Sequence, residues 1–203
     1  MSELRAVFDR CGCDKAVKHN YHKVYEKYME GRRSDPINIL EVGVFKGNSV
    51  KAWLEYFPNA TIYGVDIFVR VQPENIDVLK DPRVKWARCD STDPQQVSNL
   101  WPDTTFDFII DDGLHTPRAN KATFDNLIGK LSDGGVFLIE DVFPIDRMTP
   151  SEMSIPWIRN NTKEYNHEMF EQFMSSVKKF KHERYDNRSA TGQPDSYMFV
   201  IHK

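Results

Sequence analysis

Two short acidic segments hold the residue types best suited to metal chemistry in this chain. Asp111 and Asp112 end an apolar run, and His115 follows three residues after Asp112. Glu140 and Asp141 end a second apolar run. If these runs are neighbouring parallel strands, which lie about 5 Å apart, their carboxylates converge at one edge of a sheet. Clustered carboxylates need a compensating cation, and hard oxygen ligands favour Mg²⁺, or Mn²⁺ as a substitute.

A divalent cation at this edge can hold two adjacent hydroxyl groups of a substrate and lower the pKa of one of them. His115, at the start of the next predicted helix, can then remove the hydroxyl proton as a general base. We predict His115 and Asp112 as catalytic residues. Other interpretations stay open, because paired acids can be solvated helix caps and a single histidine is often a cap or a core residue. A zinc site is disfavoured, since no His or Cys pair accompanies the acids.

Residues 38–49, with the sequence NILEVGVFKGNS, have the pattern of a strand, a glycine turn and the start of a helix. Gly43 allows a sharp turn, and Gly47 permits close approach of a ligand to the helix start. Asp66 ends the next strand, where a carboxylate can accept both ribose hydroxyl protons. Open α/β sheets hold nucleoside-bearing cofactors in this way. Phe45 replaces the middle glycine of the usual motif, which disfavours a pyrophosphate and suits a cofactor without phosphates.

A glycine pattern alone also fits a strand-to-helix turn that binds no ligand. Glu41, Asp66 and Asp90 favour the ligand interpretation, because they fall at the ends of three successive predicted strands. Ligands of open α/β sheets bind outside these ends. Asp90 and its neighbours can meet the adenine edge of such a cofactor.

Alternating strand and helix patterns organise the chain from residue 37 onward. This alternation predicts a doubly wound α/β fold with a mostly parallel sheet. We expect strands at residues 37–42, 61–65, 84–87, 106–110, 136–139, 181–186 and 196–202. We expect helices at residues 48–57, 76–79, 95–100, 117–131 and 164–180. The last two strands flank a turn at residues 190–195 and form an antiparallel hairpin on the seven-stranded sheet.

The first 35 residues are expected to form a helical segment packed on the domain. Tyr21, Tyr25 and Tyr28 fall on one helical face, which we interpret as a packing face. Polar residues between positions 14 and 22 can lie beside the cofactor turn. Residues 146–162 are predicted to be a long loop, part of a lid over the substrate. No repeat or linker interrupts the chain, so we predict one domain.

Composition excludes several classes of partner. The 203 residues carry a net charge of -3, which gives no footprint for nucleic acid or an anionic membrane. No apolar run approaches the roughly 18 residues that span a bilayer, and the first residues lack an apolar signal core. The three cysteines show no paired metal spacing, which predicts reduced thiols and a cytoplasmic protein.

The motifs resemble, when taken together, those of a known family. The resemblance rests on EVGVFKGNS at residues 41–49, DDGLH at 111–115 and GVFLIED at 135–141. In these segments the chain is similar to the metal-dependent sugar O-methyltransferases of macrolide biosynthesis, including rhamnosyl O-methyltransferases. Residues 12–26 are similar to a Gly-Thr-Asp-Lys…His-x-Tyr…Tyr-Glu segment of part of that group, with Cys13 in place of the threonine. The resemblance covers roughly residues 12–142.

This resemblance implies a class I methyltransferase with S-adenosylmethionine as cofactor. It implies Asp112 and Asp141 as metal ligands, Glu140 beside them in the metal site, and His115 as the base. The predicted cofactor-binding residues are Lys15, Glu41, Gly43, Val44, Phe45, Gly47, Asn48, Ser49, Asp66, Ile67, Asp90, Ser91 and Asp111.

We therefore predict a Mg²⁺-assisted O-methyltransferase that acts on a hydroxyl of a sugar or a glycosylated small molecule. Alignment of oxygen, methyl carbon and sulfur would supply much of the rate acceleration. Two alternatives remain: a catechol-type small-molecule O-methyltransferase, and a non-catalytic cofactor-binding protein on the same fold. Assembly into a homo-oligomer is left open.

Overall fold

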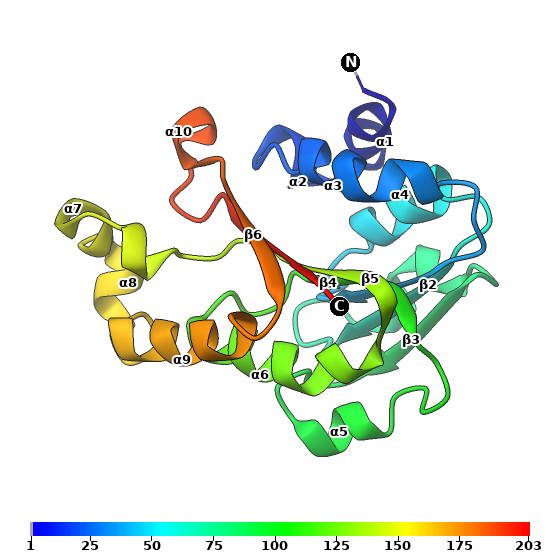
Figure 1. The fold of residues 1–203 in the computed structure, drawn as a ribbon. Helices are drawn as coiled ribbons and strands as arrows, with labels where there is room; N and C mark the ends of the chain where they lie inside the picture. Colours follow the sequence, from blue (N-terminus) through cyan, green and yellow to red (C-terminus); the bar gives the residue numbers. More distant parts are fainter. Residues whose placement is uncertain (1) are drawn as a thin grey trace.

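Short apolar runs form the strands at the centre of the molecule, because strands of a parallel sheet are buried on both faces. The structure is a computed structural model that describes residues 2–203 (Figure 1). Within these residues the strands are β1 (Asn38–Val42), β2 (Thr61–Asp66), β3 (Val84–Arg88), β4 (Phe106–Asp111), β5 (Leu131–Ile139), β6 (Lys181–Asp186) and β7 (Tyr197–His202).

These strands form a sheet in the order β3-β2-β1-β4-β5-β7-β6. Strands β1 to β5 pair in parallel, and β7 pairs antiparallel with both β5 and β6. The order reverses between β1 and β4, where open α/β sheets bind their ligands. The predicted doubly wound, mostly parallel sheet with an antiparallel C-terminal hairpin is confirmed.

Helices cover both faces of the sheet (Figure 1). One face packs against α1 (Glu3–Cys11), α3 (His22–Met29) and α4 (Asn48–Tyr56). The other packs against α5 (Pro94–Ser98), α6 (Pro117–Leu127) and α9 (His167–Val177). The shorter helical segments are α2 (Asp14–Val17), α7 (Pro150–Met153), α8 (Pro156–Asn160), α10 (Arg188–Thr191), η1 (Glu30–Arg32), η2 (Pro73–Asn75), η3 (Asp77–Lys80), η4 (Ile128–Lys130) and η5 (Ile145–Arg147). Within residues 2–203, none of the helices has both the length and the apolar character needed to cross a bilayer.

An aromatic cluster attaches the N-terminal helices to α4. The ring centroids of Phe8 and Trp53 lie 5.1 Å apart, and those of Tyr25 and Trp53 lie 4.9 Å apart. All three side chains are buried, so α1 and α3 are packed as core elements. This packing places the chain between α1 and α3 above the carboxyl ends of the central strands.

Three sequence predictions about local structure are wrong. The segment predicted as a long loop contains η5, α7 and α8, because Thr149 caps α7 and proline starts both short helices. The helix predicted to reach residue 131 ends at Leu127, and Leu131 begins β5. The turn predicted at residues 190–195 overlaps the single-turn helix α10, which ends at the left-handed Gly192.

Candidate active site

The turn after β1 brings the glycine motif against the end of β4. Gly43 has a φ of +92°, and a Cβ atom there would lie 2.1 Å from the backbone oxygen of Asp112, so only glycine fits. The Asp66 carboxylate accepts hydrogen bonds from the backbone N–H groups of Val44 and Phe45, both at 2.9 Å. Phe45 has a φ of +47°, which is strained for a non-glycine residue. The other oxygen, Asp66 Oδ1, accepts a hydrogen bond from the backbone N–H group of Phe68 at 2.6 Å, so both carboxylate oxygens hold the local backbone.

A cavity of about 270 Å³ opens beside this turn, with the start of α2 forming another wall. The predicted cofactor residues that line it are Lys15, Gly43, Val44, Phe45, Asn48 and Ser49. The other lining residues are Gly12, Cys13, Asp14, Lys46 and Asp112. One acid of the predicted metal site therefore lies in the wall of the predicted cofactor cavity.

The remaining predicted cofactor residues lie outside the lining of this cavity. Glu41 is buried, and it accepts a hydrogen bond from Ser49 Oγ at 2.9 Å. A Cβ atom on Gly47 would lie 2.6 Å from Val78 Cγ1. This side of Gly47 packs against η3, and its role in the approach of a ligand stays a prediction. The others follow the strand ends: Asp66 and Ile67 at β2, Asp90 and Ser91 after β3, and Asp111 at β4.

Asp112, His115 and Asp141 come together at the carboxyl ends of β4 and β5, and we call them the acid–histidine group. One potential ligand atom from each lies within 4.8 Å of the others. His115 Nε2 is 3.5 Å from Asp112 Oδ1. The φ angles of His115 and Asp141 are +58° and +51°, a strained backbone conformation that is common at functional sites. The two strand ends converge as the sequence predicts.

A buried lysine from α2 holds several of the acids. Lys15 is 2% exposed, and its Nζ donates to Asp112 Oδ2 at 2.6 Å and also to Glu140 Oε2. The same ammonium is 3.6 Å from Glu41 Oε1. Lys15 therefore lies between the cofactor cavity and the acid–histidine group. The sequence predicts it as a cofactor residue but does not predict these ion pairs.

Side chains from α3 and from the chain just before it hold the acids at the end of β5. Tyr25 OH donates to Glu140 Oε1, and Tyr21 OH donates to Asp141 Oδ1 at 2.8 Å. His19 Nδ1 is 3.3 Å from the same Asp141 oxygen. We call residues 12–25, which supply these groups and Lys15, the N-terminal segment. Interpreting the tyrosines as a packing face missed these hydroxyl contacts; the similarity of residues 12–26 to a family segment was the available signal.

Burial and neighbouring charges shift the pKa values of these groups in opposite directions. Burial alone would raise the pKa of Asp112, but the charges of Lys15 and His115 hold it below its usual value. Burial lowers the pKa of Lys15, but Asp112 and Glu140 raise it by more, so that it stays above its usual value. Asp112 and Lys15 therefore face each other as an ion pair. Burial also raises the pKa of Glu41 to about 7.

The acid–histidine group fits a hard divalent cation. Asp112 and Asp141 supply carboxylate oxygens, the preferred ligands of Mg²⁺ and Mn²⁺. The buried Nδ1 atom of His115 has no hydrogen-bond partner among the described residues, so this nitrogen is available to a ligand. Glu140 lies outside the group, because both of its oxygens accept hydrogen bonds from the N-terminal segment. The structure therefore does not bring Glu140 into the predicted metal site.

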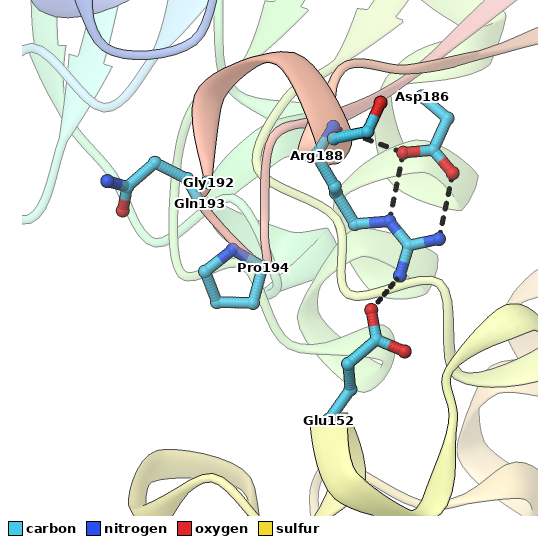
Figure 2. A pocket seen from close by; sticks show the side chains of 7 residues that line it. Glu152, Asp186, Arg188, Gly192, Gln193 and Pro194 are labelled. Carbon is cyan, nitrogen blue, oxygen red and sulfur yellow. Dashed lines mark hydrogen bonds and ion pairs between the residues drawn. The ribbon is translucent and has the colours of Figure 1, made fainter.

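A second cavity of about 370 Å³ lies between α7 and the connection from β6 to β7. Figure 2 shows Arg188 in its wall, with the guanidinium between Asp186 and Glu152. Its lining residues are Glu152, Asp186, Arg188, Ser189, Gly192, Gln193 and Pro194. The next residue, Asp195, accepts a hydrogen bond at its backbone oxygen from Tyr21 OH at 3.2 Å. One hydroxyl group thus connects the chain beside this cavity to Asp141.

Comparisons with known proteins find sugar O-methyltransferases. The chain is 30% identical over 141 residues to 8-demethyl-8-alpha-L-rhamnosyl tetracenomycin-C 2'-O-methyltransferase of Streptomyces olivaceus, covering 66% of this chain and 36% of that protein. It is 26% identical over 132 residues to mycinamicin VI 2''-O-methyltransferase of Micromonospora griseorubida, covering 62% and 32%. The chain thus spans about a third of the length of the curated relatives it matches.

A solved structure shares the fold. The MycE methyltransferase from the mycinamycin pathway, in complex with Mg, SAH and mycinamycin VI, superposes with a TM-score of 0.71 at 18% identity. The match covers 100% of this chain and 54% of that one. A family described as a methyltransferase domain matches residues 40–142, from β1 to the end of the acid–histidine group. Since that match covers half of its length, the chain belongs to the methyltransferase domain family.

Proposed function

We propose that this protein is an S-adenosylmethionine-dependent, Mg²⁺-assisted O-methyltransferase that acts on a sugar hydroxyl of a glycosylated small molecule. The observation that carries the proposal is the position of Asp112. This residue lines the cavity beside the glycine turn and also belongs to the acid–histidine group. A methyl donor in the cavity and a hydroxyl at the acid–histidine group would therefore be neighbours.

The chain's own residues divide the chemistry between them. Gly43 and Asp66 hold the turn against which the cofactor would lie. Asp112 and Asp141 would bind the cation, which when bound would chelate two adjacent hydroxyls and acidify one of them. His115 Nε2 faces the same region and would accept the proton that the hydroxyl loses. The methyl group would then pass directly from sulfur to oxygen, which requires these atoms to be aligned and requires no covalent enzyme intermediate.

A sugar acceptor is favoured over a catechol by the lining of the two cavities. Phe45 is the one aromatic residue among the lining residues of either cavity, and the second cavity is lined by charged, polar and small side chains. A narrow aromatic slot, which would favour a catechol, is not formed by these lining residues. The relatives named above act, by their names, on rhamnosyl and mycinamicin substrates. We assign the second cavity to the part of the acceptor beyond the methylated sugar.

A methyl-transfer assay tests this function. S-adenosylmethionine with a labelled methyl group is offered with rhamnosides, other deoxyhexosides and catechol, in Mg²⁺ and in EDTA. We expect transfer to a glycoside in Mg²⁺, loss in EDTA and recovery on adding Mg²⁺. Transfer to catechol alone would favour the first alternative, and full activity in EDTA would show that the acids are structural. No binding of S-adenosylmethionine at millimolar concentration would exclude the methyltransferase function. The cytoplasmic location, the absence of nucleic-acid and membrane partners and the oligomeric state stay predictions.

A further inference from the structure

Lys15 is a charged side chain inside the molecule, where an ammonium group requires close partners. It is 2% exposed, and α2, which carries it, has only four residues. Moving an ammonium out of water is costly, and such a group is retained when carboxylates compensate it. The carboxylates of Asp112, Glu140 and Glu41 all lie within 3.6 Å of its Nζ atom. The position of Lys15 is therefore tied to the acids rather than to general packing.

Asp112 is shared between Lys15 and the acid–histidine group. Its Oδ2 atom accepts the hydrogen bond from Lys15, and its Oδ1 atom faces His115. A cation bound at Oδ1 would lie across one carboxylate group from the ammonium. Two positive charges at that separation repel each other, and this repulsion is only partly screened inside a protein. The Asp112 carboxylate also binds a cation more weakly when its charge is already partly neutralised by Lys15.

We propose that Lys15 is a positioning residue that competes with the divalent cation for the Asp112 carboxylate. In the absence of the cation, its ammonium group balances the negative charge of the acids around it. The proposal rests on the proposed function. Without a metal, Lys15 keeps Asp112 and Glu140 together at the ends of β4 and β5. With a metal, its charge lowers the affinity of the site. The Lys15 ammonium, rather than the rest of the N-terminal segment, then sets the strength of metal binding.

The test measures Mn²⁺ affinity in Lys15→Met, in the absence of acceptor, by electron paramagnetic resonance of free Mn²⁺. Since a competing charge next to Asp112 is removed, we expect Mn²⁺ to bind about tenfold more tightly or better. Lys18→Met is the matched control, because Lys18 follows α2 on its exposed side and makes no ion pair with the acids within the described residues. We expect its Mn²⁺ affinity to change less than about twofold. Unchanged or weaker Mn²⁺ binding in a folded Lys15→Met protein would overturn the proposal.

A second measurement covers the case in which Lys15→Met is too unstable to fold alone, because the buried Asp112 carboxylate would then lack its ammonium partner. Thermal unfolding is followed with and without Mn²⁺ for the variant and the unmodified protein. Since a ligand stabilises the state that it binds, Mn²⁺ should raise the melting temperature of the variant more than that of the unmodified protein. An equal or smaller rise would contradict the competition. Binding of S-adenosylmethionine and Mn²⁺ to the unmodified protein is measured separately, so that failure of the proposed function is recognised as such.

Discussion

At the scale of single residues, the candidate site combines backbone strain with buried charge. His115 and Asp141 both have left-handed φ angles; His115 lies in the loop after β4, and Asp141 lies just after the end of β5. Such conformations persist only where the surrounding structure fixes them. Here Tyr21 holds Asp141 through two hydrogen bonds, one to the carboxylate and one from the backbone N–H group. Two of the three members of the acid–histidine group are thus held in a strained backbone conformation.

Replacement of His115 by alanine tests its role as the base. We expect His115→Ala to lower kcat by about 10²–10⁴, because general-base catalysis typically contributes that much. The affinity for S-adenosylmethionine should change little, since His115 does not line the cofactor cavity. His182→Ala, on β6, serves as the matched control and should retain activity. A fully active His115→Ala enzyme would remove this residue from the proposed role.

Glu41 makes stability depend on pH. Its pKa is raised from 4.5 to about 7 by burial, so the folded protein holds a proton that the unfolded chain releases between these values. Stability should therefore fall as pH rises through this window. Glu41→Gln cannot ionise, and at pH 8 it should be more stable than the unmodified protein by roughly 1–3 kcal/mol. Urea unfolding at pH 5 and pH 8 measures this, and an equal pH dependence in both proteins would contradict the assignment.

At the scale of elements, the turn between β1 and α4 shows what sequence can predict and what it cannot. The apolar run, Gly43 and Gly47 mark this turn because left-handed positions require glycine. The partners of the acids were not predictable in the same way. Lys15 and Asp112 are 97 residues apart, and Tyr25 and Glu140 are 115 residues apart. No local pattern links residues at that separation, so these particular contacts emerged only from the fold, although the sequence already places Lys15 beside the cofactor.

Gly43→Ala is expected to be among the most damaging small substitutions in this turn. The added Cβ atom would overlap the backbone oxygen of Asp112, so we expect a loss of about 3–5 kcal/mol in the free energy of unfolding, or no folded protein. Gly31→Ala is the matched control, since no atom lies within 4 Å of its added Cβ. It should change stability by less than about 0.5 kcal/mol. Chemical unfolding measures the stability of both variants. A Gly43→Ala protein of unchanged stability would contradict the close approach of Gly43 to the backbone of Asp112.

The connection from β6 to β7 is tied to α7 through Arg188, which bonds Glu152 on one side and Asp186 on the other. We expect Arg188→Ala to raise the KM for the glycoside acceptor about three- to tenfold, because the wall of the second cavity loosens. The affinity for S-adenosylmethionine should stay the same. Arg159→Ala on α8, an exposed arginine, is the control. The KM values are measured by steady-state kinetics. An unchanged KM for the acceptor in Arg188→Ala would show that the second cavity does not bind the acceptor.

At the scale of the whole molecule, the sequence predicts the central strands β1, β2 and β4 well because they are apolar runs with clear ends, whereas β5 begins at Leu131 rather than at residue 136. The strands at residues 61–66 and 84–88 differ from their predicted bounds by one residue. The short helices α7 and α8 were missed, because helices of four or five residues depend on caps and proline rather than on apolar periodicity. The hydrogen-bond partners of Glu140 were not predicted, since both come from the N-terminal segment, far away in the sequence.

The most direct test of the account is a crystal structure grown with S-adenosylhomocysteine and Mn²⁺, with anomalous scattering data to locate the metal. We expect the nucleoside product along the turn from Gly43 to Ser49, and one manganese peak between Asp112 and Asp141. The product at a different site, or manganese bound away from both carboxylates, would contradict the central claim that a methyl donor and a metal-bound hydroxyl meet at Asp112.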